Sequence, residues 1–160
     1  VCKVANLTCK FHNQSFDRLV KKADEIAENL EEDVIIQRGH TVYKPKCANF
    51  FDFASRDKMR EMMNNARVIL SHGGAGSIIF ALMAKKPLIV VPRLFSFGEH
   101  VNDHQLELVQ ALEEDKRVRA VYDIEELNSA LNSVKSLIIN NSKKPIMIQS
   151  ISNYLRGLDK

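Results

Sequence analysis

A glycine-rich run and a polar loop are the two stretches of this sequence whose residue types could do chemistry. The run, residues 71–77, reads Ser-His-Gly-Gly-Ala-Gly-Ser and stands between a hydrophobic stretch and an apolar one of helical length. A strand that passes through glycines into a helix directs backbone N–H groups and a helix N-terminus toward one point, which suits a phosphate. We therefore expect an anionic ligand here, and the candidate binding residues are His72, Gly73, Gly74, Ala75, Gly76 and Ser77.

The polar loop, residues 92–105, follows a second hydrophobic strand predicted over residues 88–91. In an open parallel sheet both loops emerge at the carboxyl edge, where such folds bind ligands. The loop carries Arg93, Glu99, His100, Asp103, His104 and Gln105. A zinc site is an alternative, because His100 and His104 are four residues apart beside Glu99, but no third ligand stands at motif spacing. We expect no metal.

The spacing of the glycine run argues against two common nucleotide-binding motifs. A GxGxxG motif starting at Gly74 would need glycine where Ile79 stands, and the acidic residue expected after the next strand is replaced by Val91-Pro92-Arg93. No Gly-Lys-Ser/Thr follows for a Walker loop. The sequence therefore disfavours dinucleotide and P-loop sites. It leaves open that the glycines only allow close packing of helix on strand, with His72 a hydrogen-bonded histidine at the strand edge.

Strands and helices alternate along the chain and must position these residues. Ser15 is the predicted N-cap of an amphipathic helix that runs to about Glu31, and Ser55 is that of a second helix whose methionines we assign to the core. A later helix should begin at residue 102 or 103, with Leu106, Val109 and Leu112 facing inward. Strands are predicted near residues 4–7, 34–37, 49–53, 68–70, 88–91 and 118–122, and further helices follow the glycine turn, Asp123 with its capping-box-like Glu126, and Pro145. This alternation predicts an α/β fold, a mostly parallel sheet with helices on both faces.

Size and charge restrict the possible functions. The 160 residues, 45% of them hydrophobic, predict one domain over residues 1–160. A net charge of +3, with basic residues interspersed among acids, argues against nucleic acid as a partner. The three cysteines form no CxxC pair and no disulfide framework, which fits a reducing cytosol. The longest apolar stretch, residues 68–84, contains His72 and three glycines and is therefore a poor membrane span. We expect a cytoplasmic protein that reaches a membrane peripherally, through a partner.

Three runs of residues together resemble the C-terminal, donor-binding domain of family 28 glycosyltransferases: residues 71–77, 86–93 and 97–108. More narrowly, they resemble the small catalytic subunits of two-part UDP-sugar transferases, in the dolichol pathway (N-acetylglucosamine transfer) and in bacterial capsule and exopolysaccharide synthesis. Residues 12–19, His-Asn-Gln-Ser-Phe-Asp-Arg-Leu, resemble a stretch near the start of the bacterial members. The resemblance covers most of residues 12–112. It implies a Rossmann-like half of a GT-B enzyme whose other half is a separate membrane-associated protein.

The resemblance implies roles for individual residues. His72 and the glycine turn would contact the diphosphate of a UDP-sugar, and His104 with Gln105 would contact hydroxyls of the transferred sugar, although this pair is also compatible with a solvated helix start. The turn at residues 53–55 would hold the uracil through backbone groups, which adds Phe53 and Ala54. Arg93 completes the expected donor-binding set.

The implied reaction is an inverting transfer of a hexose from UDP to a lipid-linked glycan acceptor, with little or no activity in the absence of the membrane-associated subunit. The UDP-sugar is a substrate, and no cofactor is expected. Such a transfer needs a general base, for which His12 and Glu99 are the candidates unless the partner supplies it.

Two departures from the family pattern favour an alternative, a non-catalytic UDP-sugar-binding or scaffold subunit. Phe80 stands where many relatives place a glutamate on the ribose, and Cys9-Lys10-Phe11 replace the usual Gly-Thr pair before His12. The predicted last helix, residues 145–158, either docks the partner or packs on its own sheet.

Overall fold

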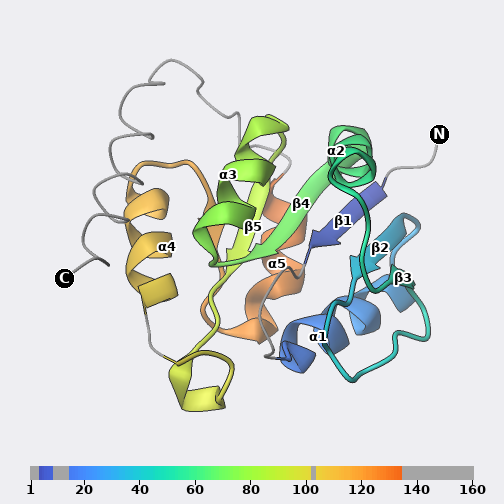
Figure 1. The fold of residues 1–160 in the computed structure, drawn as a ribbon, viewed down its shortest axis with the longest axis horizontal. Helices are drawn as coiled ribbons and strands as arrows, with labels where there is room; N and C mark the ends of the chain where they lie inside the picture. The colour runs from blue at the N-terminus through green and yellow to red at the C-terminus, as the bar shows by residue number, and fades with distance from the viewer. Residues whose placement is uncertain (1–3, 9–14, 102–103, 135–160) are drawn as a thin grey trace.

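The computed structural model describes residues 4–8, 15–101 and 104–134. In this part of the chain, six strands form one sheet in the order β3-β2-β1-β4-β5-β6, and every neighbouring pair is parallel (Figure 1). The strands are β1 (Val4–Thr8), β2 (Asp33–Gln37), β3 (Asn49–Phe51), β4 (Ala66–His72), β5 (Leu88–Val91) and β6 (Arg119–Ala120). The α-helices are α1 (Asp17–Glu28), α2 (Arg56–Asn65), α3 (Ala75–Met83), α4 (His104–Glu114) and α5 (Leu127–Ser133). The strand order reverses between β1 and β4, a position where open α/β sheets bind ligands.

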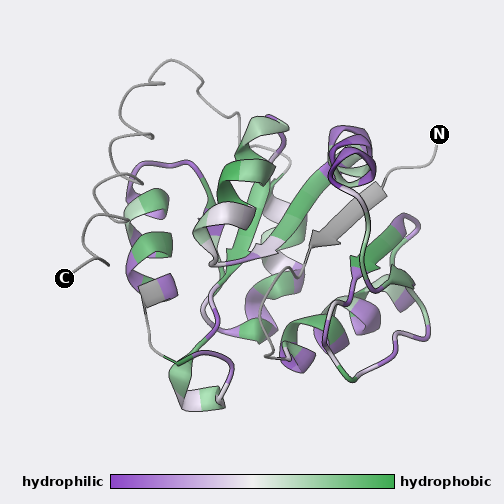
Figure 2. Cartoon of the chain, in the orientation of Figure 1, coloured by the Kyte–Doolittle hydropathy of each residue, from purple (hydrophilic) through white to green (hydrophobic). Residues whose placement is uncertain are grey.

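The central strands bury side chains on both faces of the sheet. On β4, Val68 and Leu70 belong to a core that includes α1 and α5, whereas Ile69 between them belongs to a second core with α2, α3 and α4. Successive side chains of a strand point to opposite faces, so a strand covered by helices on both sides is apolar on both faces along its covered part. Figure 2 shows this as green through the middle of β4 and along β5. The predicted α/β fold with a parallel sheet is confirmed.

Helix α1 begins differently from the prediction. Its N-cap is Phe16, without a side-chain cap, so the predicted N-cap role of Ser15 is wrong. The backbone N–H of Phe16 instead donates to Thr41 Oγ1 at 3.1 Å, and a loop distant in sequence thereby holds the start of the helix. Ser55 is confirmed as the N-cap of α2, where its side chain accepts from the Lys58 N–H. Of the three methionines of α2 assigned to the core, Met59 and Met63 are buried, and Met62 is half-buried against the same core.

The later elements also differ in detail. Leu106 is half-buried rather than inward-facing, because the buried stripe of α4 passes through Gln105, Leu108, Val109 and Leu112. Asp123 accepts from the Glu125 N–H at the start of a short 3-10 turn, η2 (Ile124–Glu126), which precedes α5. The predicted strand at 118–122 shortens to β6. The predicted helix at 145–158 lies outside the described residues. Among the helices that the structure describes, none is long and apolar enough to cross a bilayer.

Candidate functional site

The glycine turn leaves the sheet at the carboxyl end of β4, as predicted. His72, the last residue of β4, is 4% exposed, and Gly74 is the N-cap of α3. A methyl group on Gly74 would lie 2.5 Å from His72 Nε2, so the imidazole lies directly against the turn. Ser77 is buried in the first turn of α3, and its N–H donates to the Gly74 carbonyl at 3.0 Å. The turn therefore brings a histidine, a serine and the N-terminus of a helix together.

The first turn of α4, which follows the loop after β5, packs beside the glycine turn through Gln105. A methyl group on Gly73 would lie 2.8 Å from Gln105 Cβ and 3.1 Å from Val109 Cγ2, so α4 packs directly on the glycine turn. Gln105 is 7% exposed, and its Oε1 accepts from the Arg93 N–H at 3.2 Å. The structure therefore joins three predicted site residues, Gly73, Arg93 and Gln105, that come from three different elements.

Gly76 differs from the two glycines before it. A methyl group there would lie more than 4 Å from every described atom outside its own stretch of helix. Packing explains why Gly73 and Gly74 lack side chains, but it does not explain Gly76. The turn thus presents open space beside the N-terminus of α3. The Ser77 and Ile78 N–H groups donate to the Gly74 carbonyl, and the N–H groups before them have no earlier carbonyl of the helix to bond.

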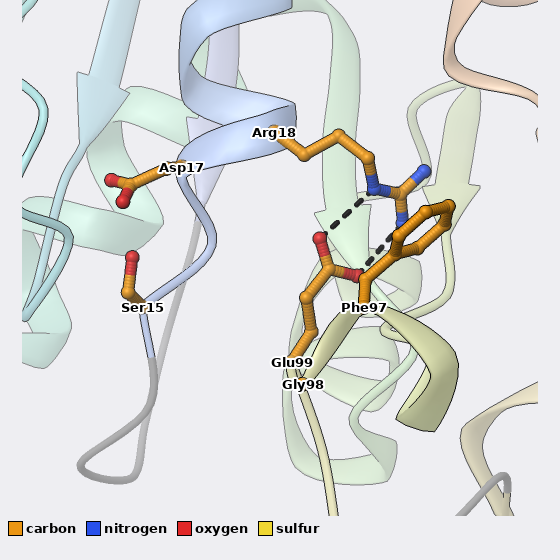
Figure 3. Close-up of a pocket in the computed structure, with 6 residues that line it drawn as sticks. All are labelled: Ser15, Asp17, Arg18, Phe97, Gly98 and Glu99. Carbon is orange, nitrogen blue, oxygen red and sulfur yellow. Dashed lines mark hydrogen bonds and ion pairs between the residues drawn. The ribbon is translucent and has the colours of Figure 1, made fainter.

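Glu99 is buried and tightly held. Arg18, in the first turn of α1, donates from Nε and Nη2 to the two carboxylate oxygens of Glu99, each at 2.9 Å (Figure 3). The Leu94 N–H also donates to Glu99 Oε2, at 3.2 Å. Together with Ser15, Asp17, Phe97 and Gly98, the pair lines a hollow of about 410 Å³. The role of Glu99 as a general base stays a prediction. In this arrangement Arg18 donates to both carboxylate oxygens, either of which would have to accept the proton.

The remaining predicted site residues lie in several places. The Arg93 guanidinium packs over the Phe16 ring, 5.2 Å from its centroid. Phe53 and Ala54 follow the edge strand β3, and the start of α2 just after them reaches α3, because the Arg56 guanidinium lies 5.8 Å from the Phe80 ring centroid. His104 begins α4, and His12 lies outside the described residues. Their roles in binding and catalysis remain predictions.

Sequence reasoning did not identify Asp24, a second buried carboxylate. It accepts from the N–H groups of Lys46, Cys47 and Ala48 and from the Tyr43 hydroxyl, all at 2.8 Å. Burial by itself raises the pKa of Asp24, but these four donors reverse the effect and hold it below the ordinary value of 3.8. The available signal was an acid four residues after Val20, on the apolar face of α1.

Metal chemistry gains no support from the described side chains. No three His, Cys, Asp or Glu residues among them are grouped to hold a metal ion. The side chain of His104 is not among those described, so the zinc alternative stays a matter for experiment.

Comparison with known proteins places the chain in a family. Residues 13–151 match the glycosyltransferase family 28 C-terminal domain, and the chain belongs to this family. Two similar relatives carry the name UDP-N-acetylglucosamine transferase subunit ALG13. The mouse (Mus musculus) protein is 32% identical over 112 residues, which cover 63% of this chain and 9% of that protein. The Candida albicans protein is 28% identical over 131 residues, which cover 80% of this chain and 43% of that protein. The chain thus spans less than half of either relative.

Solved structures agree on the fold. The kitacinnamycin glycotransferase matches with a TM-score of 0.66 at 18% identity, over 98% of this chain and 39% of that one. MurG of Acinetobacter baumannii matches with a TM-score of 0.58 at 15% identity, over 84% of this chain and 41% of that one. The described fold is a Rossmann-like half of the GT-B type, as the sequence predicted.

Proposed function

We propose that the chain is the donor-binding subunit of a glycosyltransferase that takes UDP-N-acetylglucosamine and transfers the sugar, with inversion, to a lipid-linked acceptor. Family membership and the names of the relatives support the class of donor. A membrane-associated partner subunit supplies the acceptor side and brings the chain to the membrane surface. The wall opposite the glycine turn belongs to this partner, since enclosure is what holds donor and acceptor for in-line attack.

The open space at Gly76 is the observation that carries this proposal. The diphosphate lies against the first N–H groups of α3, where the positive end of the helix dipole favours an anion. The His72 imidazole, which lies against Gly74, donates to the same phosphates and stabilises UDP as it leaves. These donors take the place of a divalent ion, so binding and transfer survive EDTA. Activity lost with the chelator and restored by manganese would contradict this part of the proposal.

The direct test is calorimetric titration of the purified chain with UDP, comparing wild type with Gly76→Ala. Alanine fits the open space and has the higher helix propensity, so the fold is kept. The added methyl group occupies the position of the ligand, and we expect UDP binding to weaken by about tenfold or more, a loss of at least ~1.4 kcal/mol. Wild-type protein that binds no uridine nucleotide would refute the proposal. A preference for NADH would instead indicate a dinucleotide site.

One observation favours the second candidate function, a UDP-sugar-binding subunit without turnover. Both oxygens of Glu99 accept hydrogen bonds from Arg18, so this candidate base is engaged. Measuring transfer after co-expression with the membrane-associated partner separates the two functions. Turnover that survives Glu99→Gln would assign the base to another residue or to the partner, whereas UDP binding without any turnover would support the non-catalytic role.

A further inference from the structure

Arg18 contacts both ends of the segment that leaves β5, residues 92–99. Besides its two hydrogen bonds to Glu99, Nη2 donates to the Pro92 carbonyl at 3.2 Å. The guanidinium also lies over the Phe97 ring (Figure 3), 4.8 Å from its centroid. The side chains of Arg18 and Glu99 are 17% and 8% exposed, so this two-pronged ion pair is shielded from solvent and stronger than a surface pair.

The two phenylalanine side chains of this segment are largely exposed to solvent. Phe95 and Phe97, which make up most of its short 3-10 turn, η1 (Phe95–Phe97), are each 61% exposed. Its internal hydrogen bonds, such as Gly98 N–H to the Phe95 carbonyl at 2.8 Å, shape the turn but do not attach it to the sheet. The contacts from Arg18 do attach it, at its first residue and at Glu99.

The attachment continues to the glycine turn. Arg93, one residue after Pro92, donates its N–H to Gln105 Oε1, and Gln105 in turn packs against Gly73. A shift of the segment therefore moves the first turn of α4 on the surface that meets the glycine turn. This chain of contacts joins α1 to the donor site through the Arg18 guanidinium, beside the packing of Arg93 on the Phe16 ring at the start of the helix.

We propose that Arg18 is a positioning residue for the donor site: its ion pair with Glu99 holds the segment after β5 so that Gln105 and the glycine turn keep their binding geometry. The proposal rests on the proposed function for the identity of the ligand. It gives Glu99 a role in binding, separate from any role as a base. Lysine cannot reproduce the two-pronged contact, so charge alone does not suffice at position 18.

The experiment combines amide hydrogen exchange with UDP titration, on Arg18→Gln and on a matched control. Arg67 donates to Glu32 at 2.7 Å in a similarly part-buried pair, but at the amino ends of β4 and β2, away from the site. In Arg18→Gln we expect about tenfold faster exchange at the Leu94 and Arg93 amides and about tenfold weaker UDP binding. Arg67→Gln loses some stability and changes neither readout. Arg18→Lys should fall between Arg18→Gln and wild type.

Further variants separate positioning from general destabilisation. Adding Glu99→Gln to Arg18→Gln should weaken UDP binding no further, because both changes break one contact. If Arg18→Gln fails to fold, Glu99→Gln alone breaks the pair from the other side and is judged on the same two readouts. Unchanged exchange at Arg93, or unchanged UDP affinity, in the folded variant overturns the proposal. Wild type that binds no UDP refutes the proposed function instead, and exchange at Arg93 still decides whether Arg18 holds the segment.

Discussion

Two loops are attached to helix α1 by opposite chemistry. The loop after β2, residues 38–48, is held by a carboxylate, because Asp24 accepts from three consecutive backbone N–H groups of the loop. The segment after β5 is held by a guanidinium, because Arg18 donates to the Glu99 side chain and the Pro92 carbonyl. Backbone donors exist whatever the side chains of a loop, whereas the second attachment needs one particular acid.

The two attachments differ in how easily they can be broken. Four donors surround Asp24, so its release would leave one buried and three part-buried polar groups without this partner at once. Glu99 depends mainly on one arginine, and a single substitution or a competing anion can change that contact. We infer that the loop after β2 sets the shape of the domain and that the segment after β5 tunes the site. The following predictions test this contrast.

The largest expected effect is that of Asp24→Asn. The amide keeps one acceptor oxygen but turns two donors toward backbone N–H groups that lose their partner. We expect the free energy of unfolding to fall by about 3 kcal/mol or more, since each unsatisfied buried donor costs about 1–3 kcal/mol. Urea denaturation measures the change, and limited proteolysis within residues 38–48 shows whether the loop detaches. A loss below about 1 kcal/mol would mean that the loop is held by other contacts.

The same carboxylate predicts a pH dependence. The folded state holds the pKa of Asp24 below its ordinary value of 3.8, so its stabilising contribution is present above that value and is lost as the pH falls through the folded pKa. The stability gap between wild type and Asp24→Asn should therefore stay constant from about pH 7 to about pH 5 and narrow below about pH 4. Denaturation curves at several pH values measure the gap. Widening in acid would contradict the assigned direction of the shift.

An intermediate effect is expected at the contact between α4 and the glycine turn. Gly73→Ala places a methyl group 2.8 Å from Gln105 Cβ, and the helix must move to accept it. Overpacking of this kind costs about 1–3 kcal/mol, and we expect UDP binding to weaken as well. Gly76→Ala is the matched control for stability, because its methyl group meets open space. Equal stability of the two variants would show that α4 does not pack as described.

The same contrast explains which parts could be predicted from the sequence. The fold follows from local patterns, since short apolar runs such as residues 68–70 and 88–91, each next to a turn signal, are typical of strands buried on both faces. The glycine turn could be predicted as a binding site because its residues are adjacent in the sequence. The ion pair between Arg18 and Glu99 joins residues 81 positions apart, and no local pattern indicates which acid an arginine meets. The sequence therefore yields Glu99 as a candidate base but does not indicate that Arg18 pairs with it.

The predicted start of helix α1 was wrong for a related reason. Ser15 has the residue type of an N-cap, yet the Phe16 N–H is satisfied by Thr41 from the loop after β2. Asp24 likewise gains its donors from that loop. In both cases a tertiary contact overrides the local preference. The start of helix α1 and the role of Asp24 follow only when the loop after β2 is placed against the helix.

The smallest expected effect concerns the aromatic ring over each arginine. Phe97 covers the Arg18 guanidinium at 4.8 Å, and on β3 Phe50 covers the Arg38 guanidinium, which pairs with Asp52, at 5.6 Å. Both rings are substantially exposed, at 61% and 42%, and a cation–π contact at such sites contributes about 0.5–1 kcal/mol. We expect Phe97→Ala and Phe50→Ala to lower stability by less than about 1 kcal/mol each.

The two variants should differ in what else they change. Removing Phe97 admits water and salt to the pair of Arg18 with Glu99, so the exchange of the Leu94 amide should quicken and become more sensitive to ionic strength. Phe50→Ala should leave that amide unchanged, because its arginine serves another loop. Exchange rates at low and high salt measure the difference. If Leu94 responds equally to both substitutions, the segment after β5 yields to general loosening of the domain, and the contrast between the two attachments does not hold.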